Sequence, residues 1–172
     1  MPCTRALKHR HCRAAAALRG LLALSLLLAA PLAGAAVSCS VNLVGVAFGI
    51  YNPLSTTPTT SAGSITVSCT NTNGGSTTVN ITATYSTGAS GTYASRTMRN
   101  GTQVLDYNLY FDAAYTQVRG DGTGGTTAGQ ATLTLGRNQT GTASGTIYGR
   151  VPAGQDVGPG AYSDTIVVTV NY

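Results

Sequence analysis

The chain is dominated by short stretches in which apolar and polar residues alternate one by one. A period of two places the apolar side chains on one face of a β-strand and the polar side chains on the other. Glycine, asparagine and proline separate these stretches and favour turns. One stretch is irregular, because its alternation shifts near Val44, as it does at a β-bulge. Strands are therefore expected at residues 39–50, 64–70, 76–85, 103–112, 131–135, 145–151 and 165–172.

The spacing of these strands predicts the fold class. Asn100-Gly101 is typical of a tight hairpin turn, and it leads into the strand at 103–112. Short strands at regular intervals, punctuated by turn residues, favour an all-β antiparallel sandwich or barrel. The sequence shows no internal repeat and no second domain.

The stretch "GPGAYSDTIVVTVNY", residues 158–172, raises a particular question. Its strand places Ile166, Val168, Val170 and Tyr172 on one face. We expect no later segment to fold back and pair with this strand. One of the most apolar strands would then present an unpaired edge, which promotes aggregation unless another chain covers it.

The first 35 residues have the features of a secretory signal peptide. Residues 1–19 are basic, and the apolar run 20–36 is short for a membrane span and contains Pro31. Ala33-Gly34-Ala35 fits the small-residue cleavage rule. We therefore expect residues 1–35 to be removed and residues 36–172 to form one exported domain. An uncleaved membrane anchor is the alternative.

Removal of the leader changes the charge balance. The whole chain carries a formal net charge of +5, whereas residues 36–172 have as many arginines as aspartates and no lysine, glutamate or histidine. Nucleic-acid binding, which needs clustered cations, loses its support. The ten charged residues of this region are Arg96, Arg99, Arg119, Arg137, Arg150, Asp106, Asp112, Asp121, Asp156 and Asp164.

The same composition argues against an enzyme. Without histidine, neither a Ser-His-Asp site nor a Cys-His site can be built, and no zinc site is expected. All five aspartates are expected in turns or on solvated strand faces. The "GDGTGG" loop at 120–125 lacks the Lys-Ser/Thr ending of a phosphate loop, and Asp121 alone is a weak calcium ligand. No cofactor or small-molecule substrate is predicted.

Two cysteines remain after the leader, Cys39 and Cys69. An even number of cysteines in an exported chain favours a disulfide, and both side chains share a strand face with apolar neighbours. The alternative is that Cys39 carries a lipid, although the preceding "AVS" lacks the usual leucine and Cys69 would be left unpaired.

The aromatic residues of the 103–115 region allow two interpretations. Tyr107, Tyr110, Phe111 and Tyr115 could form a surface for stacking sugars. Period-two spacing instead places Tyr107 and Phe111 in the core and Tyr110 against a sheet face, and we favour this interpretation.

Several motifs, in this order, resemble the spore coat protein U domain family over residues 37–172. The stretches 105–116 ("LDYNLYFDAAYT") and 159–172 ("PGAYSDTIVVTVNY") are the most specific of them. The family includes pilin subunits of the archaic, Csu-type chaperone–usher pathway. The complete set is "CSVNLVGVAFGIYNP", "ITVSCT", "YSTGASGTYASRTMRNG", "LDYNLYFDAAYTQVRGDGTGG", "IYGRVPAGQ" and "PGAYSDTIVVTVNY".

The resemblance implies an incomplete immunoglobulin-like sandwich that lacks its final strand. A periplasmic chaperone would lend a strand, and a neighbouring pilin subunit would later replace it at the outer-membrane usher, by strand addition to a sheet edge. The protein would pass through the periplasm to a surface fimbrium. The edge that accepts the strand would be formed by Ile166, Val168, Val170 and Tyr172.

One departure from the family concerns the segment before Cys39. Polymerising pilins of this type have a donor segment there, whereas only two or three residues separate the expected cleavage point from Cys39. Such a segment spans roughly 10 Å and is too short to complete a neighbour's sheet. The subunit is therefore expected to accept a strand without donating one, as at a fibre tip or end. A secreted coat protein with a self-complete sandwich is the main alternative, and a carbohydrate-binding module is a more distant one.

Overall fold

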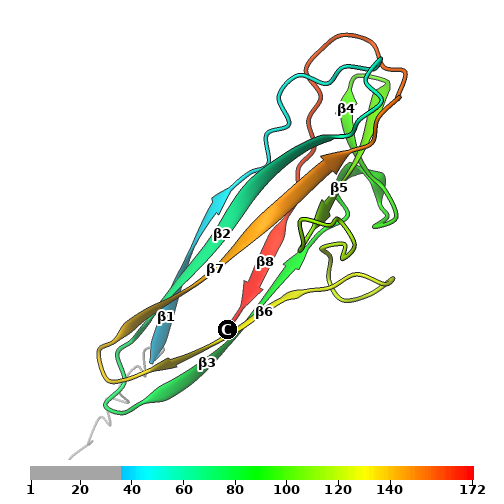
Figure 1. Ribbon diagram of the computed structural model, residues 1–172. Helices are drawn as coiled ribbons and strands as arrows, with labels where there is room; N and C mark the ends of the chain where they lie inside the picture. The colour runs from blue at the N-terminus through cyan, green and yellow to red at the C-terminus, as the bar shows by residue number, and fades with distance from the viewer. Residues whose placement is uncertain (1–35) are drawn as a thin grey trace, which may run out of the picture. The chain divides into compact units, whose positions relative to one another are not determined.

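The computed structural model describes residues 36–172, and the predicted signal peptide at residues 1–35 lies outside this range. Eight antiparallel strands form two sheets (Figure 1). The larger sheet has the order β1-β2-β7-β5-β4, and the smaller has the order β6-β3-β8. The described part contains no α-helix, only a 3-10 turn at Gly88–Ser90. This turn is too short to span a membrane. The predicted all-β antiparallel sandwich is confirmed.

The strand bounds follow the alternating stretches, with differences at their ends. The strands are β1 Val37–Val44, β2 Thr59–Asn71, β3 Thr77–Tyr85, β4 Arg96–Asn100, β5 Gln103–Tyr110, β6 Gly129–Leu135, β7 Thr140–Val151 and β8 Val168–Asn171.

β4 was not among the expected strands, and β7 begins at Thr140 instead of residue 145. Three further differences have a physical reason. β1 ends at Val44, where the alternation shifts, although a strand was expected to residue 50. β2 begins at Thr59, inside a stretch expected to be a loop, because this stretch pairs with the end of β7 at Val151. β8 has only four residues, because the residues before it cross between the sheets.

The core is formed by the inward faces of both sheets. On β2 from Gly63 and on β3 from Val79, every second residue is buried, as alternation requires. β7 contributes small residues to its inward face, with Gly141, Ala143 and Gly145 along its first half. The buried apolar residues are Ile65, Val67, Cys69, Val79, Ile81, Ala83, Tyr85, Met98, Leu105, Tyr107, Leu109, Leu135, Ile147 and Val151.

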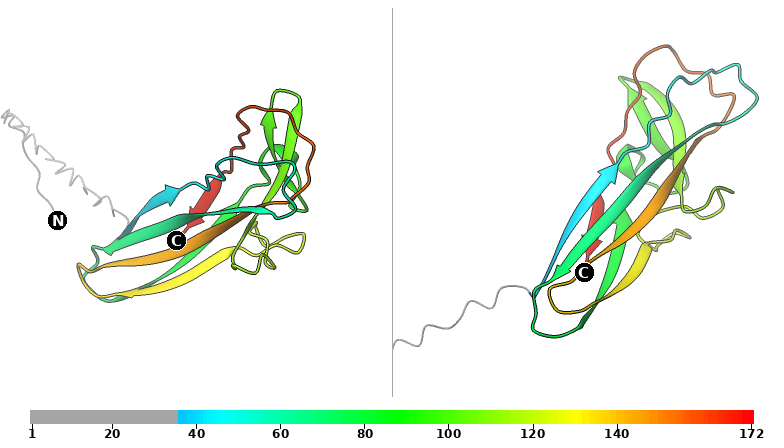
Figure 2. Two further views of the ribbon diagram at one scale, coloured as in Figure 1. Left: turned by 45° about the horizontal axis from the view of Figure 1, so that its top comes forward. Right: turned by 60° about the vertical axis from the view of Figure 1, so that its left-hand side comes forward.

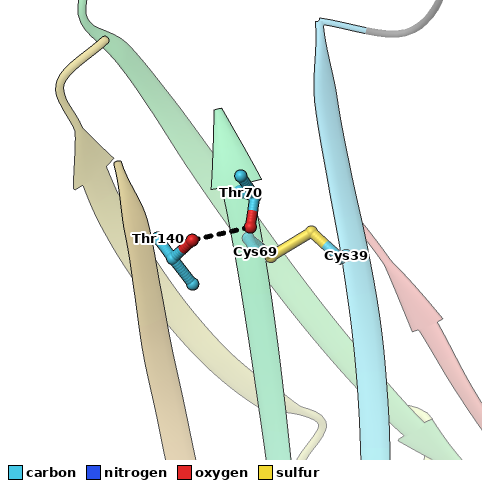
Figure 3. Close-up of a disulfide and its surroundings, with 4 residues drawn as sticks. All are labelled: Cys39, Cys69, Thr70 and Thr140. Carbon is cyan, nitrogen blue, oxygen red and sulfur yellow. Dashed lines mark hydrogen bonds between the residues drawn. A yellow bond between two sulfur atoms is a disulfide. The ribbon is translucent and has the colours of Figure 1, made fainter. Parts of the chain in front are cut away.

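The predicted disulfide is confirmed and joins β1 to β2. Cys39 and Cys69 are directly opposite in the strand register, and their sulfur atoms are bonded (Figure 3). On the other side of β2, the hydroxyls of Thr70 and Thr140 form a hydrogen bond of 2.7 Å to β7. The disulfide therefore fastens the edge strand β1 to the interior of its sheet, and the alternative role of Cys39 as a lipid attachment site is excluded while the disulfide is intact.

Two arginines are buried in the sandwich and are bonded to neutral groups. Arg96 donates to the carbonyls of Ser86 and Arg119 and to Oδ1 of Asn108. Arg119 donates to two backbone carbonyls and to the hydroxyl of Tyr85, and its guanidinium lies 3.6 Å from the centre of the Phe111 ring. Burial lowers the pKa of both guanidinium groups. These hydrogen bonds connect the start of β4 and the residues around Arg119 to the end of β3 and to β5 and β7.

Candidate functional site: the groove between β1 and β8

Two strand edges that belong to different sheets face one another along one side of the sandwich. Among the described residues, β1 pairs with β2 alone, and β8 pairs with β3 alone. In both views of Figure 2 the red strand β8 runs next to the cyan strand β1. Each strand therefore has one edge whose N–H and C=O groups are free to pair with another strand.

The inward face of β1 is exposed where it should be covered. Val41 and Leu43 lie directly opposite Val67 and Ile65 of β2, and opposed residues point to the same face of a sheet. Val67 and Ile65 are only 4% and 6% exposed, whereas Val41 and Leu43 are 47% and 44% exposed. Within residues 36–172, the core therefore continues to β1 but leaves its inward face partly exposed.

A cavity of about 290 Å³ marks this opening. We call it the β1–β8 groove. It is predominantly apolar, and its walls come from β1, the segment after β1, the segment before β8 and the inward faces of both sheets. The lining residues are Leu43, Gly45, Val46, Phe48, Tyr85, Met98, Tyr107, Leu109, Ile147, Tyr162, Ser163, Asp164, Ile166 and Val168. A second cavity, of about 690 Å³, shares Val46, Phe48, Met98 and Tyr162 with it and extends between the 46–53 and 157–162 loops.

The first wall of the groove continues beyond β1 as an extended apolar segment, residues 45–51. This segment crosses the inward face of the larger sheet, where Ser61 Oγ donates to the carbonyl of Ala47 at 2.6 Å. Glycine allows the close approach, because a Cβ on Gly149 would lie 2.5 Å from Val46 and 2.8 Å from the Phe48 ring. The Phe48 ring packs edge-on against Tyr107. The segment therefore covers part of the core that the smaller sheet does not reach.

The second wall changes sheets before it becomes β8. Ser163 first pairs with Arg99 of β4, with N···O distances of 2.8 and 3.2 Å in the two directions. Four residues later, Val167 bonds to Ser86, the residue after β3: the Ser86 amide donates to the carbonyl of Val167, and the Val167 amide donates to Ser86 Oγ. The wall therefore crosses from the larger to the smaller sheet between residues 163 and 167.

Three of the four residues predicted for the accepting edge face the interior. Ile166, Val168 and Val170 are half-buried against the core, and Ile166 and Val168 line the β1–β8 groove. Tyr172 is 59% exposed and is not among the lining residues. The alternation of the sequence correctly identified the inward face of this wall, but it did not identify the residues of the opposite wall.

Asp164 is the charged residue of the groove lining, and sequence reasoning missed it. The expectation that Asp164 is solvated is wrong, because its side chain is half-buried and lines the groove on the same face as Ile166 and Val168. The Tyr107 hydroxyl donates to Asp164 Oδ2 at 2.8 Å. Burial, followed by this hydrogen bond, raises the pKa of Tyr107 far above its ordinary value. The signal that could have located Asp164 is its position two residues before Ile166 in the same alternation.

The other candidate sites have structural explanations. Tyr107 is buried, and Phe111 packs against Arg119, so both contribute to the interior. Tyr110 and Tyr115 pack edge to face with ring centres 5.5 Å apart. Asp121 accepts hydrogen bonds from the amide and hydroxyl of Thr123, which shape its turn and lower its pKa. Within residues 36–172, no group of three or more potential metal ligands comes together.

Comparison with known proteins gives one family match. A family model described as the Spore Coat Protein U domain matches residues 24–169, a range that begins inside the predicted signal peptide. No curated protein sequence matches the chain.

Several solved structures resemble the chain in fold. One is the crystal structure of the CsuC–CsuE chaperone–tip adhesion subunit pre-assembly complex from archaic chaperone–usher Csu pili of Acinetobacter baumannii. The similarity has a TM-score of 0.48 at 18% sequence identity, and covers 79% of this chain and 40% of that chain.

Proposed function

Because the chain belongs to the Spore Coat Protein U domain family, we propose that it is an exported structural subunit of a bacterial surface fibre. In this proposal, another polypeptide inserts an extended strand into the β1–β8 groove. A periplasmic chaperone supplies the first strand, and a neighbouring subunit supplies the strand that replaces it at the outer-membrane usher. The protein acts by assembly rather than by catalysis, in the periplasm during transit and then at the cell surface.

The observation that carries the proposal is the exposed inward face of β1. Val41 and Leu43 together leave apolar surface in water that a neighbouring strand would cover. Burying apolar surface stabilises a complex by about 25 cal/mol per Å² of area removed from water, before the costs of association. Exposed apolar surface beside an unpaired strand edge is also a hazard for aggregation. A strand from a partner removes both sources of instability at once.

An extended strand fits this groove better than a helix or a small ligand does. The free edges of β1 and β8 both offer backbone donors and acceptors, which a strand satisfies by ladder hydrogen bonds. The lining is apolar along the inward row that contains Ile166 and Val168, so alternate side chains of the incoming strand would fill it. The proposed accepting edge consists of Ile166, Val168, Val170 and Tyr172, with Val41 and Leu43 on the opposite wall.

Expression of residues 36–172 in a bacterial periplasm, with and without a candidate periplasmic chaperone, tests this proposal. We expect soluble protein mainly in the presence of the chaperone, purified as a complex of one copy of each. A soluble monomer obtained in equal yield without the chaperone, and no more stable when the chaperone is bound, contradicts the proposal. That result would favour the alternative, a secreted coat protein with a self-complete sandwich.

Substitution of the groove lining separates strand insertion from nonspecific association. Val168→Asp places a charge in the groove, and we expect it to abolish the chaperone complex. Thr169→Asp is the matched control, because Thr169 is exposed on the opposite face of the same strand. Equal loss of the complex in both variants would contradict an interaction through the groove.

We also propose that the subunit accepts a strand without donating one, as at a fibre tip or end. Cleavage after residue 35 would leave Ala36 as the first residue, and its carbonyl already accepts a hydrogen bond from the Thr72 amide beside β1. Mass spectrometry of the exported protein tests this proposal. A mature N-terminus ten or more residues before Cys39 would contradict it.

A further inference from the structure

One carboxylate interrupts the apolar row that forms the second wall of the β1–β8 groove. The inward-facing residues along this wall are Tyr162, Asp164, Ile166, Val168 and Val170, all of them half-buried. A carboxylate is rarely found among apolar side chains at such a position unless it is paired or has a role.

The bonds of Asp164 show how the structure holds it. Oδ1 accepts hydrogen bonds from the Ala89 amide at 2.9 Å and from the Thr165 amide at 2.8 Å. Oδ2 accepts one hydrogen bond, from the Tyr107 hydroxyl. All three donors are neutral, and a carboxylate can accept about four hydrogen bonds. The side chain is therefore fixed in place while Oδ2 keeps the capacity to accept a further hydrogen bond.

The position of Asp164 makes it sensitive to any strand that fills the groove. It lies where the wall crosses between the sheets, among lining residues that include Val46, Phe48 and Met98. An apolar side chain placed over Asp164 would remove water from the carboxylate without replacing the lost hydrogen bonds, which is costly. A carboxylate there would repel it, whereas a cation would complement its charge.

We propose that Asp164 selects the partner strand by requiring a lysine or arginine at the position that faces it. The occupant of the groove would thus be an extended segment of alternating apolar residues in which one inward-facing residue is basic. This inference rests on the proposed function, since it assumes that a strand inserts here. It adds a determinant of register and specificity, because only one alignment of such a strand pairs the two charges.

Binding of synthetic peptides to the chain, displaced from its chaperone complex, tests this inference. In the peptides, valine or isoleucine alternates with serine. One inward-facing residue is replaced by lysine, leucine or glutamate, and the replaced position differs from one version of the peptide to the next. We expect one position at which the lysine peptide binds at least tenfold more tightly than the glutamate peptide. The preference should weaken with added salt, as it does for partly exposed charge pairs.

Variants assign this preference to the carboxylate. In Asp164→Asn and Asp164→Leu the lysine preference should disappear, and in Asp164→Leu the leucine peptide should bind best. Asp156 is exposed and does not line the groove, so the Asp156→Asn variant should keep the lysine preference. If Asp164→Leu fails to fold, Tyr107→Phe provides a second test. It removes a donor to Oδ2 and should strengthen the lysine preference.

The outcomes separate this inference from the proposed function. If peptides bind with equal affinity whatever residue they carry, selection by Asp164 is wrong and strand insertion stands. If no alternating peptide binds at all, the proposed strand insertion itself is contradicted. Retention of the lysine preference in both Asp164 variants would also overturn the inference.

Discussion

At the scale of single residues, the groove is defined by side chains whose surroundings contradict their chemical type. Val41 and Leu43 are apolar and exposed, while Asp164 is charged and half-buried. Tyr85 and Tyr107 line the same groove and are almost completely buried, with their hydroxyls bonded to Arg119 and Asp164. The groove therefore combines buried, hydrogen-bonded tyrosines at its base with exposed apolar side chains on β1.

The two buried tyrosines predict how stability depends on alkaline pH. Burial is the main cause that raises the pKa of Tyr85 and Tyr107 above the ordinary value of about 10. A group whose pKa is raised by folding stabilises the folded state below the unfolded pKa, and this stability is lost as the pH rises toward the folded pKa. We therefore expect stability to fall above about pH 10.

Urea unfolding between pH 7 and 11 measures this effect, with tyrosinate absorbance recorded in parallel. Tyr85 and Tyr107 should ionise at higher pH in the folded chain than in the unfolded chain, because burial raises the pKa of both. Tyr107→Phe should reduce the loss of stability above pH 10, whereas Tyr172→Phe, at an exposed position, should not. Ionisation of all tyrosines in the folded chain near pH 10 would disagree with this account.

At the scale of elements, the two walls of the groove are held by different means. β1 is fixed by its ladder to β2 and by the Cys39–Cys69 disulfide. The wall before β8 is held by scattered bonds at Ser163, Asp164 and Val167 instead of a continuous ladder. The walls should therefore respond differently to substitution.

Loss of the disulfide should weaken the β1 wall. The cysteines are separated by 30 residues, and closing a loop of this size stabilises a fold by about 3–4 kcal/mol in the chain-entropy model. We expect Cys39→Ser to lower the free energy of unfolding by about this amount, and to lower the periplasmic yield as a consequence. Thermal unfolding with and without reductant provides the check, and identical midpoints for the wild-type chain would show that the expectation is wrong.

Crowding beneath residues 45–51 should also destabilise the groove. Gly149→Ala would place a Cβ against Val46 and Phe48, and overpacking of this kind costs about 1–3 kcal/mol. Gly145→Ala, on the same face of β7, is the control, because its nearest atoms would be 3.7 Å away. Urea unfolding of both variants measures the difference, and equal stability of the two would refute close packing of this segment.

The sequence predicts the strands better than it predicts the groove, and the reason is physical. Alternation reports which residues share a face, so it correctly placed Ile166, Val168 and Val170 inward. It does not report which strand covers a face, so the exposure of Leu43 could not be read from it. The crossing of residues 45–51 depends on Gly149, which is about 100 residues later in the chain.

At the scale of the whole molecule, the sandwich has a continuous core and one uncovered side. Its disulfide, its buried arginines and its two antiparallel sheets are formed among residues 36–172 themselves. In the proposed function, one further strand in the β1–β8 groove would complete the contact between the two sheets. We therefore regard the isolated chain as a folded domain that becomes fully stable only when a partner contributes that strand.

Amide hydrogen exchange of residues 36–172, alone and with the chaperone bound, tests this central claim most directly. Exchange is read on peptides from residues 37–48 and 162–172, with β2 and β7 as internal references. The account predicts rapid exchange in both groove walls of the isolated chain and at least tenfold slower exchange in the complex, with little change in the references. Strong protection of both walls in the isolated chain would contradict it.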